Sequence, residues 1–167
     1  KECISFCKSL NNQNIRNKLL IRLHTRRFWD EEIMFKKKVP EANIDYGYTP
    51  ISQIINNSKL VVYSYISTGY LETLASNYPT IIFANLDDCL LNNETLDDLK
   101  TLHDANIFHY NFNSAASFIN NNFSSIYNWW DSDKTQKARK NFCQKYAFLN
   151  KNKINDLIKV FNSNLIK

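Results

Sequence analysis

The chain has 167 residues, of which 44% are apolar, so it is long and apolar enough to fold around a core of its own. Its formal charge of +5 suits a ligand that carries phosphate. No basic stripe with interleaved aromatic residues is present, which argues against nucleic acid as a partner, and no run approaches the roughly 20 apolar residues of a membrane-spanning helix.

The four cysteines form no CxxC pair, and no signal peptide is visible at Lys1, where the chain opens within a helical pattern. We therefore expect a cytoplasmic protein whose contact with the inner face of the membrane is peripheral at most. The opening at Lys1 also suggests a piece cut from a longer chain.

Five short apolar runs rich in β-branched residues predict strands, and helical patterns alternate with them. The runs are Lys18–His24, Ala42–Tyr46, Lys59–Ser64, Thr80–Ala84 and Asn106–Tyr110. Runs that are apolar throughout indicate strands covered on both faces, as in parallel sheets. Strand–helix–strand units of this length predict right-handed crossovers. The fold class is therefore α/β, a Rossmann-like, doubly wound, mostly parallel sheet of about five strands.

Helical patterns fill the spaces between the predicted strands. Pro40 ends the first of them, and Thr49 and Pro50 predict the N-cap and the first position of the second. The four predicted helices cover residues 28–38, 50–57, 69–77 and 94–105.

The chain is helical from Ser114 onward. The sequence Asp131-Ser132-Asp133 predicts the cap of an amphipathic helix that runs to about Leu149, and a last helix follows from about Asn152. We predict one nucleotide-sugar-binding domain over residues 1–167, with a sheet part at 15–112 and a helical tail at 113–167.

The chain contains only two glycines, which excludes both a Gly-rich dinucleotide loop and a phosphate-binding P-loop. One of them, Gly69, follows Ser67 and Thr68 after the third predicted strand. Ligands of open parallel sheets bind at the carboxyl ends of the strands, where these hydroxyls could meet a phosphate. Glu72, one turn further, could accept hydrogen bonds from a ribose. On the residues alone, a plain helix cap with Glu72 as a dipole partner explains the pattern better.

Arg22 ends the first predicted strand at the same edge, where its planar guanidinium suits a phosphate. The alternative is a surface ion pair with an acid such as Glu31 or Glu32.

His109 and Asn85 follow the fifth and fourth strands. His109 could hydrogen-bond a phosphate or sugar or act as an acid or base, and Asn85 could contact the base or the sugar. A structural role is the alternative for His109. Asp87 and Asp88 are adjacent loop acids with poor chelating geometry, so we predict no metal site.

The string from Leu71 to Ile82 (LETLASNYPTII) resembles the signature of the carboxyl-terminal domain of GT-B glycosyltransferases. In that signature a Leu-Glu-x-x-Ala helix is followed by a turn and Pro-x-Ile or Pro-x-Val. The resemblance implies that Glu72 holds the donor ribose and that Ser67, Thr68 and Gly69 face the donor phosphates. Ser64 stands where many retaining members carry a second Glu, so inversion or retention stays open.

Further motifs recur in the same order in transferases assigned to bacterial surface carbohydrate biosynthesis. They are Arg22-Leu23, Ile107-Phe108-His109, Ser114-Ala115-Ala116, Trp129-Trp130 and the run from Ala138 to Cys143. This resemblance covers most of residues 15–150. Because family members are several times longer, it implies that the amino-terminal domain with the acceptor site is missing from this chain.

The resemblance implies the donor-binding half of a glycosyltransferase, inactive alone, that moves a sugar from a nucleotide sugar to a surface polysaccharide or lipid-linked glycan. It implies no cofactor apart from the nucleotide-sugar substrate, and no metal. Two alternatives stay open. One is half of a sugar-nucleotide epimerase or polyol-phosphate transferase, and the other is a non-catalytic binding or assembly module with the same fold.

Overall fold

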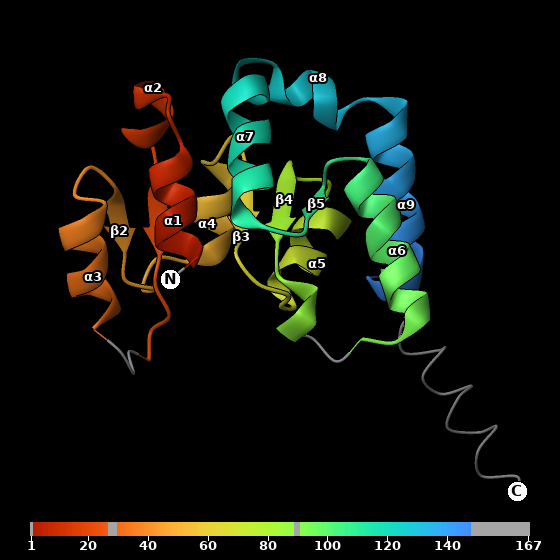
Figure 1. The fold of residues 1–167 in the computed structure, drawn as a ribbon, viewed down its shortest axis with the longest axis horizontal. Helices are drawn as coiled ribbons and strands as arrows, with labels where there is room; N and C mark the ends of the chain where they lie inside the picture. Colours follow the sequence, from red (N-terminus) through yellow and green to blue (C-terminus); the bar gives the residue numbers. More distant parts are fainter. Residues whose placement is uncertain (1, 27–29, 89–90, 148–167) are drawn as a thin grey trace, which may run out of the picture.

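A computed structural model describes residues 2–26, 30–88 and 91–147 of the chain and confirms the α/β class (Figure 1). Each strand predicted within these residues is present, although shorter than its apolar run. The strands are β1 (Leu20–Arg22), β2 (Asn43–Asp45), β3 (Val61–Tyr63), β4 (Thr80–Phe83) and β5 (Phe108–His109). All of their recorded pairings are parallel.

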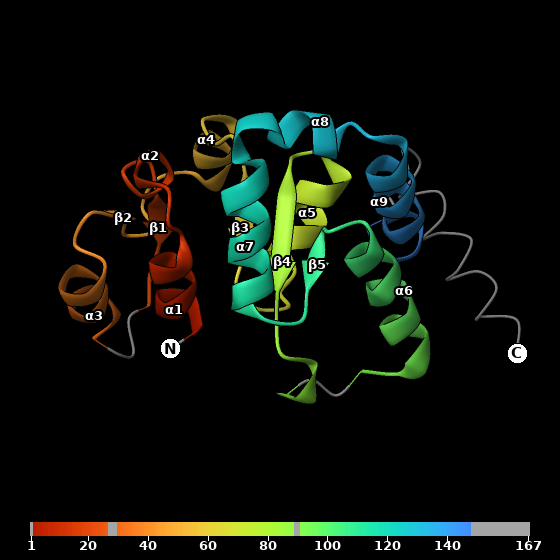
Figure 2. The same ribbon diagram turned by 45° about the horizontal axis from the view of Figure 1, so that its top comes forward.

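The strands form two sheets rather than the single sheet that the sequence predicts. β1 pairs with β2, and β3, β4 and β5 form a second sheet in that order. The two sheets follow one another across the molecule in Figure 2. One hydrophobic core spans both, because Ile21 of β1 and Ile81 of β4 belong to the same buried cluster. Side-chain packing therefore joins the sheets where no backbone ladder does in the described part of the chain.

Helices precede, connect and follow the strands (Figure 1). Those up to β4 are α1 (Glu2–Ser9), α2 (Gln13–Arg16), α3 (Glu31–Lys38), α4 (Ile51–Asn56) and α5 (Gly69–Ala75). Those after β4 are α6 (Asn93–Asp104), α7 (Phe112–Asn122), α8 (Ile126–Trp130) and α9 (Asp133–Tyr146), with short 3₁₀ turns at Leu86–Asp88 and Phe123–Ser125. The helix expected from about Asn152 lies outside the described residues.

β4 is buried on both faces, as its uninterrupted apolar run predicts. Its side chains alternate between two cores. Ile81 and Phe83 pack in the cluster that contains residues of α1 and α7, whereas Ile82 packs in the cluster that contains residues of α5, α6 and α9. Figure 2 shows α7 and α5 on opposite sides of β4. The larger sheet is thus covered on both faces, which is the doubly wound arrangement.

Of two predicted helix caps, one is confirmed and the other is wrong. Ser132 caps α9, because its hydroxyl accepts a hydrogen bond from the Thr135 amide at 3.4 Å. The prediction of Thr49 as N-cap of α4 is wrong, since that position belongs to Pro50, whose ψ of 130° is extended. Pro50 is thus the residue before the helix, and α4 starts at Ile51.

The carboxyl end of α5 is fixed by side chains from the helical tail. Arg139 Nη1 donates to the Leu74 carbonyl at 2.8 Å, and Trp130 Nε1 donates to the Asn77 carbonyl at 3.1 Å. Asn77 has a left-handed φ of 58°, and the following amide of Tyr78 bonds back to the Thr73 carbonyl at 2.9 Å. The motifs around Trp130 and Arg139 in the sequence therefore hold the helix that carries Glu72.

The amino end of α5 is fixed by Tyr63 of β3. The Tyr63 hydroxyl donates to the Gly69 carbonyl at 2.9 Å. A Cβ added to Gly69 would lie 3.0 Å from Cε1 of the Tyr63 ring, closer than ordinary van der Waals contact. Glycine therefore suits the close approach of the helix to this ring, because a side chain here would require the ring to shift.

We predict that Gly69→Ala lowers the free energy of unfolding as long as Tyr63 is present. In a Tyr63→Val background the same substitution should instead stabilise the protein by up to about 1 kcal/mol, because alanine is the better helix former once the clash is gone. Urea unfolding of the four proteins in the cycle measures both effects. Stabilisation by Gly69→Ala in both backgrounds would show that the contact imposes no constraint.

Candidate nucleotide-binding site at the start of α5

The turn from Ser64 to Thr68 connects β3 to α5 at the carboxyl end of the sheet. Thr68 is the N-cap residue of α5, but its side chain makes no capping hydrogen bond. Ser67 is half-buried, and within the described residues neither hydroxyl bonds to another protein group. The simple capping role that the sequence favoured is therefore not filled, and both hydroxyls are available to a ligand.

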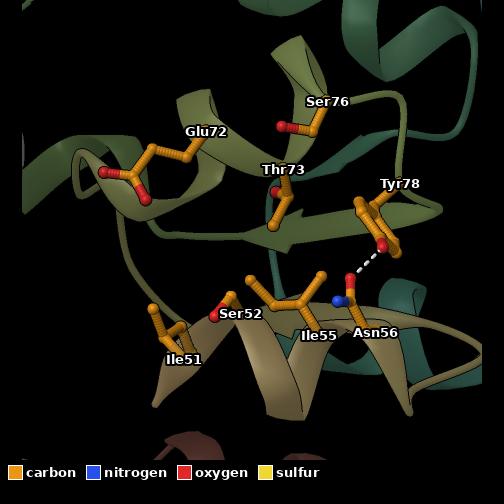
Figure 3. A pocket seen from close by; sticks show the side chains of 8 residues that line it. All are labelled: Ile51, Ser52, Ile55, Asn56, Glu72, Thr73, Ser76 and Tyr78. Atoms are coloured by element: carbon orange, nitrogen blue, oxygen red, sulfur yellow. Dashed lines mark hydrogen bonds between the residues drawn. The ribbon is translucent and has the colours of Figure 1, made fainter.

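Glu72 lies one turn into α5, with an exposed side chain. It lines one end of a pocket of about 220 Å³ between α4 and α5 (Figure 3). The α5 wall carries Glu72 and Ser76, and Thr73 between them donates its hydroxyl to the Tyr70 carbonyl, whereas the α4 wall presents the apolar side chains of Ile51 and Ile55. A ligand in this pocket would meet the Glu72 carboxylate and the Ser76 hydroxyl on one side and hydrocarbon on the other.

The sequence analysis did not predict the pocket wall formed by α4. It assigned this segment only a short helix that connects two strands. α4 buries no residue completely, and Ile51 is 43% exposed. A helix that faces a sheet normally buries its apolar stripe. The sequence did carry a signal for this pocket wall. Ile51 and Ile55 are four residues apart, on one face of a helix that follows a strand at the ligand-binding edge.

Exposed tyrosines in two loops at the same edge were also missed. Tyr48 follows β2 and is 78% exposed, and Tyr65 follows β3 and is 63% exposed. Aromatic rings exposed singly need no explanation, but these two lie in the loops that lead into α4 and α5, the helices that form the pocket.

Arg22 is engaged within the protein rather than free at the sheet edge. Its Nη1 donates to Asp45 Oδ2 at 2.7 Å and to the Thr49 carbonyl at 2.8 Å, and its Nη2 lies 3.3 Å from the Gly47 carbonyl. The sequence analysis considered Glu31 or Glu32 as its ion-pair partner, and the structure gives Asp45 instead. Arg22 thus stabilises the turn between β2 and α4, and we call its bonds to Asp45, Gly47 and Thr49 the brace of this turn.

Asp45 completes this brace. Desolvation alone would raise its pKa, but hydrogen bonds from Thr49 and from the Gly47 amide, together with the charge of Arg22, lower the pKa of the carboxyl. Gly47 has a φ of +84°, and a Cβ there would lie 2.8 Å from the Thr25 methyl group. The turn therefore depends on both a glycine and an ionised carboxylate.

His109 lies in the interior, with only 2% of its surface exposed. Its Nδ1 is 2.8 Å from the Ser114 hydroxyl, and its Nε2 is 3.2 Å from the Asn106 carbonyl, which can only accept. Desolvation lowers the pKa of His109 to about 4, so its imidazole is neutral near pH 7. This placement fits the structural role better than contact with a phosphate or sugar.

Asn85 follows β4 and is exposed, and its side-chain oxygen accepts a hydrogen bond from the Asp87 amide at 3.2 Å. The structure therefore brings Ser67, Thr68, Gly69 and Glu72 together on one turn and helix. Arg22 and His109 belong to β1 and β5, Asn85 follows β4, and each of the three is bonded within the protein.

Within residues 2–26, 30–88 and 91–147, no three His, Cys, Asp or Glu side chains converge as metal ligands would. Among the helices of these segments, none is long and apolar enough to cross a membrane.

Comparison with protein families then identifies the class as transferase. The chain belongs to the LIC12162 family of transferases, whose family description matches residues 1–161. Neither a curated protein nor a solved structure gives a significant match.

We predict that Arg22→Gln and Asp45→Asn each lower the free energy of unfolding by about 1 kcal/mol, since each breaks the brace of the β2–α4 turn. The double variant should lose less than the sum of the two, because the groups share one interaction. Chemical denaturation measures the cycle. Lys100→Gln, which removes an exposed helical ion pair, serves as the control and should cost less than about 0.5 kcal/mol. Additive losses would exclude a shared role.

The low pKa of His109 predicts a pH dependence of stability. The unfolded chain takes up the proton near pH 6.5 and the folded chain near pH 4, so stability falls as the pH drops through this window. The slope due to His109 is at most about 1.4 kcal/mol per pH unit. His109→Gln should flatten the profile between pH 6.5 and 4 relative to the wild-type chain, as chemical denaturation at each pH measures. Equal slopes in the variant and the wild type would contradict the assignment.

Proposed function

We propose that this chain is the donor-binding part of a glycosyltransferase and binds a nucleotide sugar at the start of α5. Membership in a transferase family supports the reaction class. The observation that carries the proposal is the position of Glu72, an exposed carboxylate at one end of a pocket, one turn after two hydroxyls that make no bond to any described residue. These groups match what a ribose and a phosphate would need.

In this proposal the nucleoside enters the pocket between α4 and α5. The ribose hydroxyls donate hydrogen bonds to the Glu72 carboxylate, and the sugar ring or base packs on Ile51 and Ile55. Hydrogen bonds from hydroxyls to an ionised carboxylate are stronger than neutral ones, so Glu72 contributes much of the affinity.

The phosphates of the donor lie over the turn before α5. The hydroxyls of Ser67 and Thr68 and the first amides of α5 donate to the phosphate oxygens. As the glycosidic bond to the nucleotide breaks, negative charge grows on the leaving phosphate, and these donors stabilise it. Gly69 allows the turn to approach the phosphate closely, and Arg22 contributes by holding the neighbouring turn in place.

The acceptor in this proposal is a surface polysaccharide or a lipid-linked glycan, bound by an amino-terminal domain outside this sequence. That domain would also supply the base that activates the acceptor hydroxyl. The same donor site would serve half of an epimerase or of a polyol-phosphate transferase, which product analysis with the longer protein distinguishes.

We predict that Glu72→Ala weakens the binding of the preferred nucleoside diphosphate or monophosphate by at least about tenfold, or about 1.4 kcal/mol. Glu72→Gln, which keeps one acceptor oxygen, should lose less. Isothermal titration of the chain with CMP, UDP, CDP, GDP and ADP measures the affinities.

Glu94→Ala provides the matched control, since Glu94 also lies exposed in the first turn of a helix. Its substitution should leave nucleotide affinity unchanged. Equal nucleotide affinities of Glu72→Ala and Glu94→Ala would show that Glu72 does not bind the nucleotide and would rule out the proposed site. Absence of binding to every nucleotide would favour the non-catalytic assembly module.

A further inference from the structure

The end of the pocket away from Glu72 is formed by two polar side chains that bond to each other. The Tyr78 hydroxyl donates to Oδ1 of Asn56, the last residue of α4 (Figure 3). Tyr78 comes from the turn after α5, where the Thr73 carbonyl accepts from its amide. The bond therefore ties the end of the weakly packed α4 to the firmly held end of α5.

This bond fixes which way the Asn56 amide faces. With Oδ1 occupied by the tyrosine, the side chain has its Nδ2 group left, which carries two donors. Figure 3 shows this nitrogen on the Ile55 side of the amide. No described residue accepts a hydrogen bond from Nδ2, and Ser76 on the facing wall likewise makes no side-chain bond within the described residues.

The two ends of the pocket thus differ in chemistry. Glu72 offers acceptors at one end, and Asn56 offers donors at the other. Glu72 and Ser76 are four residues apart on α5, about 6 Å along the helix axis. The distance from a ribose hydroxyl to the far edge of the attached base is of similar size. The complementary ligand has hydroxyl donors at one end, flat apolar faces, and an acceptor oxygen at the other end.

We propose that Asn56 donates a hydrogen bond to a ring carbonyl oxygen of the nucleobase, with Tyr78 as the residue that positions its amide. The inference rests on the proposed function and deepens it. Uracil, cytosine and guanine each carry such a carbonyl, whereas adenine has none. A site built this way favours the carbonyl-bearing bases, because adenine offers the Asn56 donor no carbonyl oxygen.

Asn56→Asp tests the role of the donor directly. Aspartate has nearly the same shape and still accepts the Tyr78 hydrogen bond, but it has no N–H to offer. Asn57→Asp is the matched control, since it places the same charge on the next residue, outside the pocket lining, and thus reproduces the repulsion of a nucleotide phosphate.

The experiment titrates UDP, CDP, GDP and ADP into the wild-type chain and both variants. We expect at least one carbonyl-bearing nucleotide to bind the wild type at least about tenfold more tightly than ADP. Asn56→Asp should remove this preference, with a loss of about tenfold or more relative to Asn57→Asp, and should change ADP affinity no more than the control does. Tyr78→Phe should weaken the preferred nucleotide by less, since the donor stays present but is no longer oriented.

Two results would overturn the inference alone: ADP binding as tightly as every other nucleotide, or Asn56→Asp behaving as Asn57→Asp while Glu72→Ala still abolishes binding. If no nucleotide binds the wild-type chain, the proposed function fails and the inference fails with it. The Glu72 variants therefore separate the two failures.

Discussion

α5 is held at both ends by side chains from other parts of the chain, and the candidate site depends on this constraint. Tyr63 of β3 bonds to the first residue of the helix, while Arg139 and Trp130 bond to carbonyls at its end. Arg139 is 8% exposed and has no carboxylate partner in the described residues, so the negative end of the helix dipole is what favours its charge there. The helical tail thereby fixes Glu72 from more than sixty residues away.

The opposite wall of the pocket is held more lightly. α4 buries no residue. Arg22 bonds to the Thr49 carbonyl before the helix, and at its end Tyr78 bonds to Asn56 and Ser58 to the Ile54 carbonyl. The wall from α5 thus carries the charged group and is held at both ends, whereas the wall from α4 presents Ile51 and Ile55 and buries no residue.

The sequence predicted the features that depend on local pattern, and it missed those that depend on contacts between distant residues. Uninterrupted apolar runs identified the strands and the burial of β4 on both faces, and the serine before Asp133 identified the start of α9. The division into two sheets, the partner of Arg22 and the interior position of His109 depend on how the strands pack in space. The pocket was missed because its second wall comes from α4, which carries no motif of its own.

The alternation of β4 between two cores has a consequence for how the fold selects its strand register. In a sheet with one solvent-exposed face, a register shift of one residue would expose the apolar side chains to water, which costs free energy. Both faces of β4 are buried, so a shift in register would not move its apolar side chains into water. The wrong register is instead disfavoured by poor packing of side chains in the two cores. Phe83 stacks on Phe6 of α1 with ring centroids 5.0 Å apart, which is one such shape-specific contact. The alignment of the central strand therefore draws on a contact with the amino-terminal helix, which is distant in the sequence, and contacts of such range slow folding.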